Sequence, residues 1–217
     1  MMIIQHRGNG NFFKNSITTL LVFLVLALLP ISCDVVCTNP CGCGPAPQVR
    51  SFNIISFSSA SYNSNGVEVS DELFLPYNEV YKSIKVEEFE FVSEAAQVSK
   101  GAFPGLVYAC SPVPPKSTNA LLYLEIYNSN EVTLGDGTVL QVGEILNDYF
   151  EISSDFTVSP KNIEDFFTEK QEIYSYEPFK LYFTKNPEKE TVITFSVRFF
   201  LENQVEKVLN EVVLSIK

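Results

Sequence analysis

The chain has 217 residues, of which 46% are hydrophobic, and it carries 26 acidic against 15 basic side chains, for a net charge of −11. Its single histidine is His6, and it contains no tryptophan. A surface this acidic repels phosphate backbones, so we expect no nucleic-acid partner. Because no histidine follows His6, the rest of the chain lacks the residues for Ser-His-Asp or Cys-His catalysis and for histidine metal ligation.

The N-terminal region has the pattern of an export signal. Leu20–Leu29 is an unbroken apolar run, preceded by Arg7 and Lys14, and no acid occurs before Asp34. A helix of this length spans about 15 Å, half of the hydrocarbon core of a bilayer, so the run is too short for a permanent spanning helix. We therefore predict that residues 1–32 are a signal peptide.

The signal ends in Ile31-Ser32-Cys33, which places a small residue directly before a cysteine. This ending resembles the lipobox of bacterial lipoproteins, in which the cysteine is diacylated and becomes the mature N-terminus. The resemblance implies lipidation of Cys33 and an envelope location, which we expect to be the outer membrane. The alternative is an ordinary signal peptide cut near Ser32 or Cys33, with Cys33 in a disulfide.

Residues 33–48 form a tether rich in Cys, Pro and Gly. Apart from Cys33 the chain has Cys37, Cys41, Cys43 and Cys110, and an even number in an exported chain predicts two disulfides. Cys41 and Cys43 are too close for an unstrained bridge, so we favour Cys37–Cys41 and Cys43–Cys110. A four-thiolate metal site is the alternative, but the spacing is not typical of zinc. We expect neither a metal nor a cofactor.

The first half of residues 49–217 shows short strand-like segments. The pattern predicts a strand over Val49–Ser58, a small, polar loop over Ser58–Gly66 and a bulged strand over Ile84–Val92. A short strand over Leu106–Cys110 ends at a proline-rich stretch. Ala120–Tyr127 alternates, with one face consisting of Ala120, Leu122, Leu124 and Ile126.

The middle of the domain carries turn and helix signals. Val132–Val142 predicts a hairpin whose turn, Gly135-Asp136-Gly137, supplies the positive φ that such turns need. Ile145–Phe150 is compatible with a helical turn or an extended loop. Ser159 and Pro160 predict a helix start, followed by a short amphipathic helix over Lys161–Glu169.

The clearest alternation lies at the C-terminal end. Apolar residues alternate over Phe179–Phe183, Thr191–Leu201 and Val208–Ile216, with a turn at residues 186–189. We predict a three-stranded meander that forms the centre of the core. The predicted buried face of its middle strand is the odd-numbered set Ile193, Phe195, Val197, Phe199 and Leu201.

Seven or eight strands and one short helix predict an all-β fold over residues 49–217. The expected architecture is a two-sheet antiparallel β-sandwich, immunoglobulin-like, with one short helix. The lipobox-like cysteine, the Cys-rich tether, Ala109–Pro112, Asn147–Phe150 and the terminal strands resemble a group of uncharacterised Bacteroidota lipoproteins. The resemblance implies an envelope location and an all-β fold, and no activity.

Three clusters are candidates for chemistry. Glu87, Glu88 and Glu90 could hold a glycosidase-like acid pair, but an acidic solvent face is the simpler interpretation. Asp136 could be a calcium ligand, although a turn role fits better. Exposed tyrosines could form a platform for sugars or proteins; Tyr123 and Tyr127 share a strand face, and Tyr174 and Tyr176 lie close together.

We therefore expect a lipid-anchored envelope lipoprotein with a non-catalytic role in interaction or assembly, whose partners are the membrane and envelope proteins. A glycan-binding accessory lipoprotein is the first alternative, and it would expose several coplanar tyrosines along one groove. A carboxylate-dependent hydrolase is the second, and it would need two acids across a deep pocket.

Overall fold

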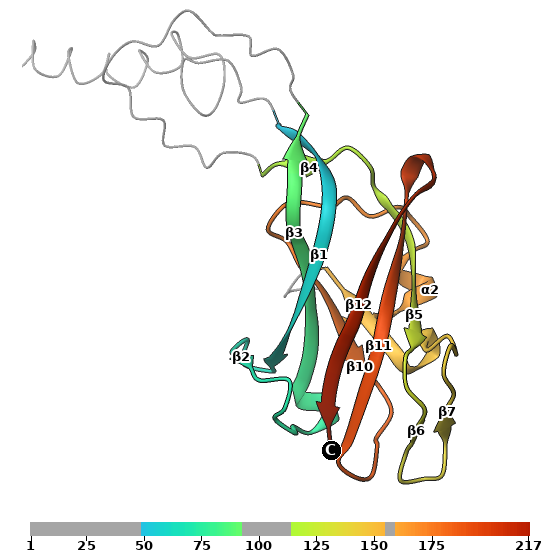
Figure 1. The fold of residues 1–217 in the computed structure, drawn as a ribbon. Helices are drawn as coiled ribbons and strands as arrows, with labels where there is room; N and C mark the ends of the chain where they lie inside the picture. The colour runs from blue at the N-terminus through green and yellow to red at the C-terminus, as the bar shows by residue number, and fades with distance from the viewer. Residues whose placement is uncertain (1–48, 93–113, 155–158) are drawn as a thin grey trace, which may run out of the picture. The chain divides into compact units, whose positions relative to one another are not determined.

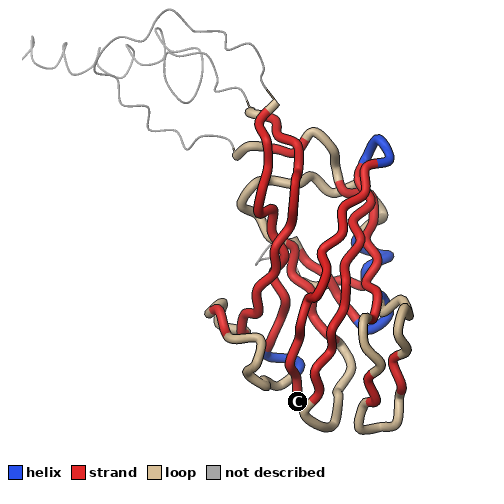
Figure 2. The backbone as a smooth tube through the Cα atoms, viewed as in Figure 1, coloured by secondary structure: helices blue, strands red, loops and turns tan. Residues whose placement is uncertain are grey.

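The computed structural model describes residues 49–92, 114–154 and 159–217, which belong to one compact unit (Figures 1 and 2). The predicted signal peptide, the tether and the predicted strand Leu106–Cys110 lie outside the described residues. So do Cys33 and the four disulfide candidates, Cys37, Cys41, Cys43 and Cys110.

Two sheets form the body of this unit. Sheet A has the order β2 (Glu68–Val69), β1 (Ser51–Asn63), β3 (Val80–Phe91), β10 (Phe179–Phe183), β8 (Phe150–Ser153) and β9 (Lys161–Asn162), and β4 (Lys116–Ser117) pairs in parallel with β1. Sheet B has the order β12 (Val205–Ile216), β11 (Thr191–Leu201) and β5 (Leu121–Asn128). The predicted all-β fold of two mainly antiparallel sheets with one short helix is confirmed.

The smaller elements connect these strands. A hairpin of β6 (Val132–Thr133) and β7 (Val139–Leu140) stands beside sheet B, and it confirms the predicted turn. Among the described residues, one short helix, α2 (Ile163–Phe166), is accompanied by three 3₁₀ turns at η1 (Tyr77–Glu79), η2 (Asn147–Tyr149) and η3 (Glu202–Gln204).

Aromatic rings join the two sheets across the core. The Phe57 ring of β1 stacks on Phe199 of β11 at 4.1 Å between centroids, and Phe150 of β8 meets Phe195 at 5.2 Å. The predicted buried face of β11 is confirmed, because all five odd-numbered residues from Ile193 to Leu201 are at most 2% exposed. Since one face of β11 faces the core along its whole length, the register of the strand is fixed.

The predicted C-terminal meander is confirmed for its last two strands, β11 and β12, but it is wrong for β10. Strand β10 pairs with β3 and β8 in sheet A, whereas β11 pairs with β12 and β5 in sheet B. Residues 184–190 therefore cross from one sheet to the other, a gap of about 10 Å. Alternation shows that a strand has one buried face. It does not show whether two successive strands pair in the same sheet or lie in two facing sheets, because the pattern is the same in both cases.

The predicted loop over Ser58–Gly66 is also wrong in its first part. Strand β1 continues to Asn63, because its backbone pairs with β3 as far as Val80. Small polar side chains suit this stretch, since Ser61 hydrogen-bonds to the buried Lys82 and to the partly exposed Asp71. The predicted bulge is confirmed, as the β1–β3 register shifts on both sides of the Ser56–Glu88 pair.

The predicted helix over Lys161–Glu169 is shortened to α2. Lys161 and Asn162 form β9 on β8, and Asn162, rather than Ser159, caps the helix by accepting a 2.7 Å hydrogen bond from the Asp165 backbone N–H.

The predicted buried face of β5 also changes. A register shift beside Leu121 leaves Leu122 44% exposed and buries Leu121 instead.

Candidate interaction face and polar groove

The predicted acidic candidates lie on the solvent side. Glu87, Glu88 and Glu90 are all exposed on β3, as expected of an acidic surface, and an acid pair for hydrolysis needs one desolvated member. Within the described ranges, no group of three or more His, Cys, Asp or Glu side chains is arranged to hold a metal.

Asp136 has a structural role in the β6–β7 turn. Its carboxylate lies 2.8 Å from Lys185 Nζ and accepts a 2.9 Å hydrogen bond from the Thr138 backbone N–H. The Lys185 hydrogen bond, followed by the bonds from Thr138, lowers the pKa of Asp136 to about 2. The carboxylate thus ties the turn to the chain between β10 and β11, in line with the predicted turn role.

The outer face of sheet B carries several aromatic side chains together with Arg198. Tyr123 and Tyr127 of β5 do share this face, as predicted, and strand pairing sets Phe200 opposite Tyr123 and Arg198 opposite Glu125. Val208 of β12 lies opposite Arg198 and is 52% exposed. The side chains of Tyr123, Tyr127, Arg198 and Phe200 are all half-buried.

Polar contacts hold this face in one arrangement. The Arg198 guanidinium carbon lies 5.1 Å from the centroid of the Tyr127 ring, and the Tyr127 hydroxyl donates a short hydrogen bond to Glu125. That hydrogen bond is the main reason that the pKa of Tyr127 is raised. The Tyr123 ring meets Phe167 edge-on at 5.7 Å, and its hydroxyl accepts a hydrogen bond from Asn147.

A second group of tyrosines crosses the outer face of sheet A. The Tyr62 and Tyr81 rings stack at 5.8 Å, and Tyr81 meets Tyr182 at 5.3 Å, so one ring comes from each of β1, β3 and β10. Burial is the main reason that the pKa of Tyr81 is raised. The buried Lys180 ammonium lies 5.8 Å from the Tyr81 ring.

Two hollows lie at the end of this row and share two lining residues. One has a volume of about 310 Å³ and is lined by residues that include Ser64, Asn65 and Glu79. The other, of about 330 Å³, is lined by residues that include Glu151 and Thr184. Both are also lined by Asn78 and Tyr182, and we call the two hollows together the Tyr182 groove.

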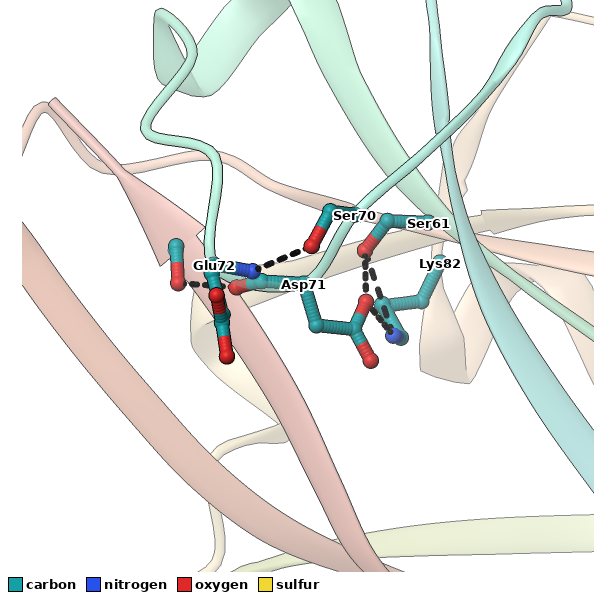
Figure 3. A network of polar contacts seen from close by, with 6 residues as sticks. Ser61, Ser70, Asp71, Glu72 and Lys82 are labelled. Carbon is teal, nitrogen blue, oxygen red and sulfur yellow. Dashed lines mark hydrogen bonds and ion pairs between the residues drawn. The ribbon is translucent and has the colours of Figure 1, made fainter.

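A buried lysine network was not predicted from the sequence. Lys82 is 0% exposed, and its Nζ lies 2.8 Å from Asp71 Oδ1 and 3.2 Å from Ser61 Oγ (Figure 3). Ser61 also donates a 2.6 Å hydrogen bond to Asp71, while Ser215 of β12 donates one to the Asp71 backbone carbonyl. The network therefore connects the loop after β2 to β1 and β3 of sheet A and to β12 of sheet B. Lys82 falls in the period-two set of Val80, Ile84 and Val86, and this signal could have shown its burial.

No family model and no curated protein matches this chain. Solved structures with similarity include the C-terminal domain of the Streptococcus agalactiae AgI/II polypeptide BspA, in wild-type and mutant forms, each with a TM-score of 0.28 and 14% sequence identity. The similarity covers 74% of this chain and 46–50% of those chains, so this chain spans about half of their length. In the described part of the chain, no helix has the length and apolar character to cross a bilayer.

Proposed function

We propose that this protein is a lipid-anchored lipoprotein of the bacterial envelope, held at the outer membrane through Cys33, and that its sandwich has a non-catalytic role in binding another envelope protein. The observation that carries the interaction role is the outer face of sheet B. Tyr and Arg are the residue types most often found at the energetic centre of protein interfaces, and this face sets Tyr123, Tyr127 and Arg198 beside Phe200 and Val208.

The chemistry of the face indicates the kind of partner. Glu125 and Glu206 lie opposite Arg198 and Phe200, so carboxylates flank the aromatic centre. Residues 33–217 carry all 26 acids of the chain and all but two of its bases. A partner surface with a basic rim around an apolar centre would complement this face, since opposite potentials favour encounter and orientation.

Photo-crosslinking in the native host would test the interaction role. A photoreactive phenylalanine analogue at Phe200 of the full-length protein should give a discrete adduct with another envelope protein. Val208→Asp, which places a charge on an exposed position of the face, should abolish the adduct. The same analogue at Glu88, an exposed position on β3 of sheet A, is the control. An equal adduct from both positions, or none from Phe200, would contradict the proposal.

The anchor has its own test. Cys33→Ala should release the protein from membranes or stall its processing, because the thiol that accepts the lipid is lost. Intact-mass measurement of the mature wild-type protein should show the increment of a diacylglycerol group. A mature protein without this increment would exclude lipidation at Cys33 and leave the interaction role to be judged on the crosslinks.

A further inference from the structure

We infer that the Tyr182 groove is a binding site for a neutral oligosaccharide. The first argument is its lining. Amide, hydroxyl and carboxylate groups come from Asn65, Asn78, Ser64, Thr184, Glu79 and Glu151, and they surround the half-buried ring of Tyr182. A polyhydroxylated ligand needs such donors and acceptors at the walls and an apolar surface for the face of the sugar ring.

The second argument is that the groove is already built. Tyr182 is braced by Tyr81, and Tyr81 is braced by Tyr62, so the ring has little freedom to lose when a ligand binds. The Asn63 side chain accepts hydrogen bonds of 3.0 Å from the backbone N–H groups of Asn65 and Val67, which fixes the turn at the rim. The Ser64 backbone N–H donates to the Glu79 carbonyl at 2.8 Å and joins the two walls.

The third argument concerns charge. Glu79 and Glu151 bring a carboxylate to each hollow, and Lys180, which also lines the first hollow, is only 1% exposed. Carboxylates at both ends of a groove repel acidic sugars and leave neutral ones as the matching class.

The position of the groove fits this role. It lies at the end of β1 next to Asn63, whereas the chain from the tether joins β1 at Ser51. A strand of this length spans about 40 Å, so the groove and the start of β1 lie at opposite ends of the strand. A long glycan can therefore reach it without passing that end.

The inference can be tested on the full mature protein in detergent micelles. The probes are cellohexaose, maltohexaose and mannohexaose, with hexagalacturonic acid as the acidic counterpart, and the measurement is isothermal titration calorimetry. At least one neutral hexasaccharide should bind with a Kd between about 10 µM and 1 mM, and the acidic one should bind at least about tenfold more weakly.

Variants locate the binding. Tyr182→Ala and Asn78→Ala should each raise the Kd for the hexasaccharide at least about tenfold. Tyr182→Phe keeps the ring, and its Kd should stay within about threefold of the wild-type value. Asn78 is exposed, so its variant should keep the fold even if Tyr182→Ala does not. Tyr127→Ala, on the outer face of sheet B, should leave binding unchanged. Absence of binding by all three neutral probes, stronger binding of the acidic probe, or binding that survives Asn78→Ala would overturn the inference.

Discussion

The ammonium of Lys82 lies 2.8 Å from the carboxylate of Asp71, and the side chain of Lys82 is fully buried whereas that of Asp71 is 44% exposed. The two partners should therefore tolerate removal differently. Asp71→Asn leaves a buried charge without its counter-charge, while Lys82→Met replaces the ammonium with an apolar group of similar length. We expect Asp71→Asn to lower the free energy of unfolding by about 1–3 kcal/mol and Lys82→Met to change it by less than about 1 kcal/mol. Urea denaturation of both variants measures this, and equal losses would argue against the asymmetry.

The same lysine predicts a pH dependence of stability. Burial lowers the pKa of Lys82 from its ordinary value of 10.5, while Asp71 opposes the shift. Between the lowered pKa and 10.5, the unfolded chain binds more protons than the folded one at this site. The contribution of Lys82 to the free energy of unfolding should therefore rise with pH through that window and stay constant below it.

The comparison with Lys82→Met isolates this effect. The pKa values of Lys170 and Lys185 are raised by hydrogen bonds to Glu202 and Asp136, and the stability from these pairs is lost at high pH in both proteins alike. We expect the free energy of unfolding of the wild type, measured relative to that of Lys82→Met, to increase between neutral pH and pH 10.5. A difference that stays constant or falls would show that Lys82 keeps its proton in the fold.

Two residues on opposite faces of β11 should differ strongly in their effect on stability. Phe195 is 0% exposed in the core, so Phe195→Ala should cost about 3–5 kcal/mol. Arg198 is half-buried on the outer face of sheet B, outside the core, and Arg198→Ala should cost less than about 1 kcal/mol. Thermal melts decide the matter. If both variants lost the same stability, the outer face of sheet B would be part of a core.

The β6–β7 turn depends on two glycines for different reasons. Gly137 has a φ of +87°, as expected for this turn, whereas Gly135 has no positive φ. A Cβ at Gly135 would lie 2.6 Å from the Glu188 Cβ and 2.9 Å from the Pro187 carbonyl oxygen. Gly135→Ala should cost about 1–3 kcal/mol through this clash, and Gly137→Ala about 1 kcal/mol through its backbone. Chemical denaturation of the two variants measures both losses. If residues 187–188 move aside freely, Gly137→Ala should lose more stability than Gly135→Ala.

The cysteines that follow Cys33 should be oxidised in the exported protein. Alkylation under denaturing, non-reducing conditions should label none of Cys37, Cys41, Cys43 and Cys110. Reduction before alkylation is the control and should expose all four thiols. Labelling of Cys110 alone without reduction would rule out a Cys43–Cys110 bridge and leave the sandwich unaffected.

The site could be predicted only in part. That Tyr123 and Tyr127 share a face follows from period two on one strand, and the structure confirms it. Their neighbours Arg198 and Phe200 come from a strand some seventy residues away, and only strand pairing brings them there. The Tyr182 groove is lined by the turn after β1 and by residues of β3, β8 and β10, and no local pattern in the sequence connects these segments.

The sequence by itself determined the all-β class and the bounds and buried face of β11, because a one-residue slip would place Thr194, Ser196 and Arg198 in the core. It did not determine that β5, rather than β10, lies beside β11, that β1 extends to Asn63, or that Lys82 is buried. Alternation is a local property set by the geometry of one strand, so it shows which side chains face inward. Sheet membership and the burial of a charged group depend on contacts between distant segments, and only the assembled tertiary structure decides them.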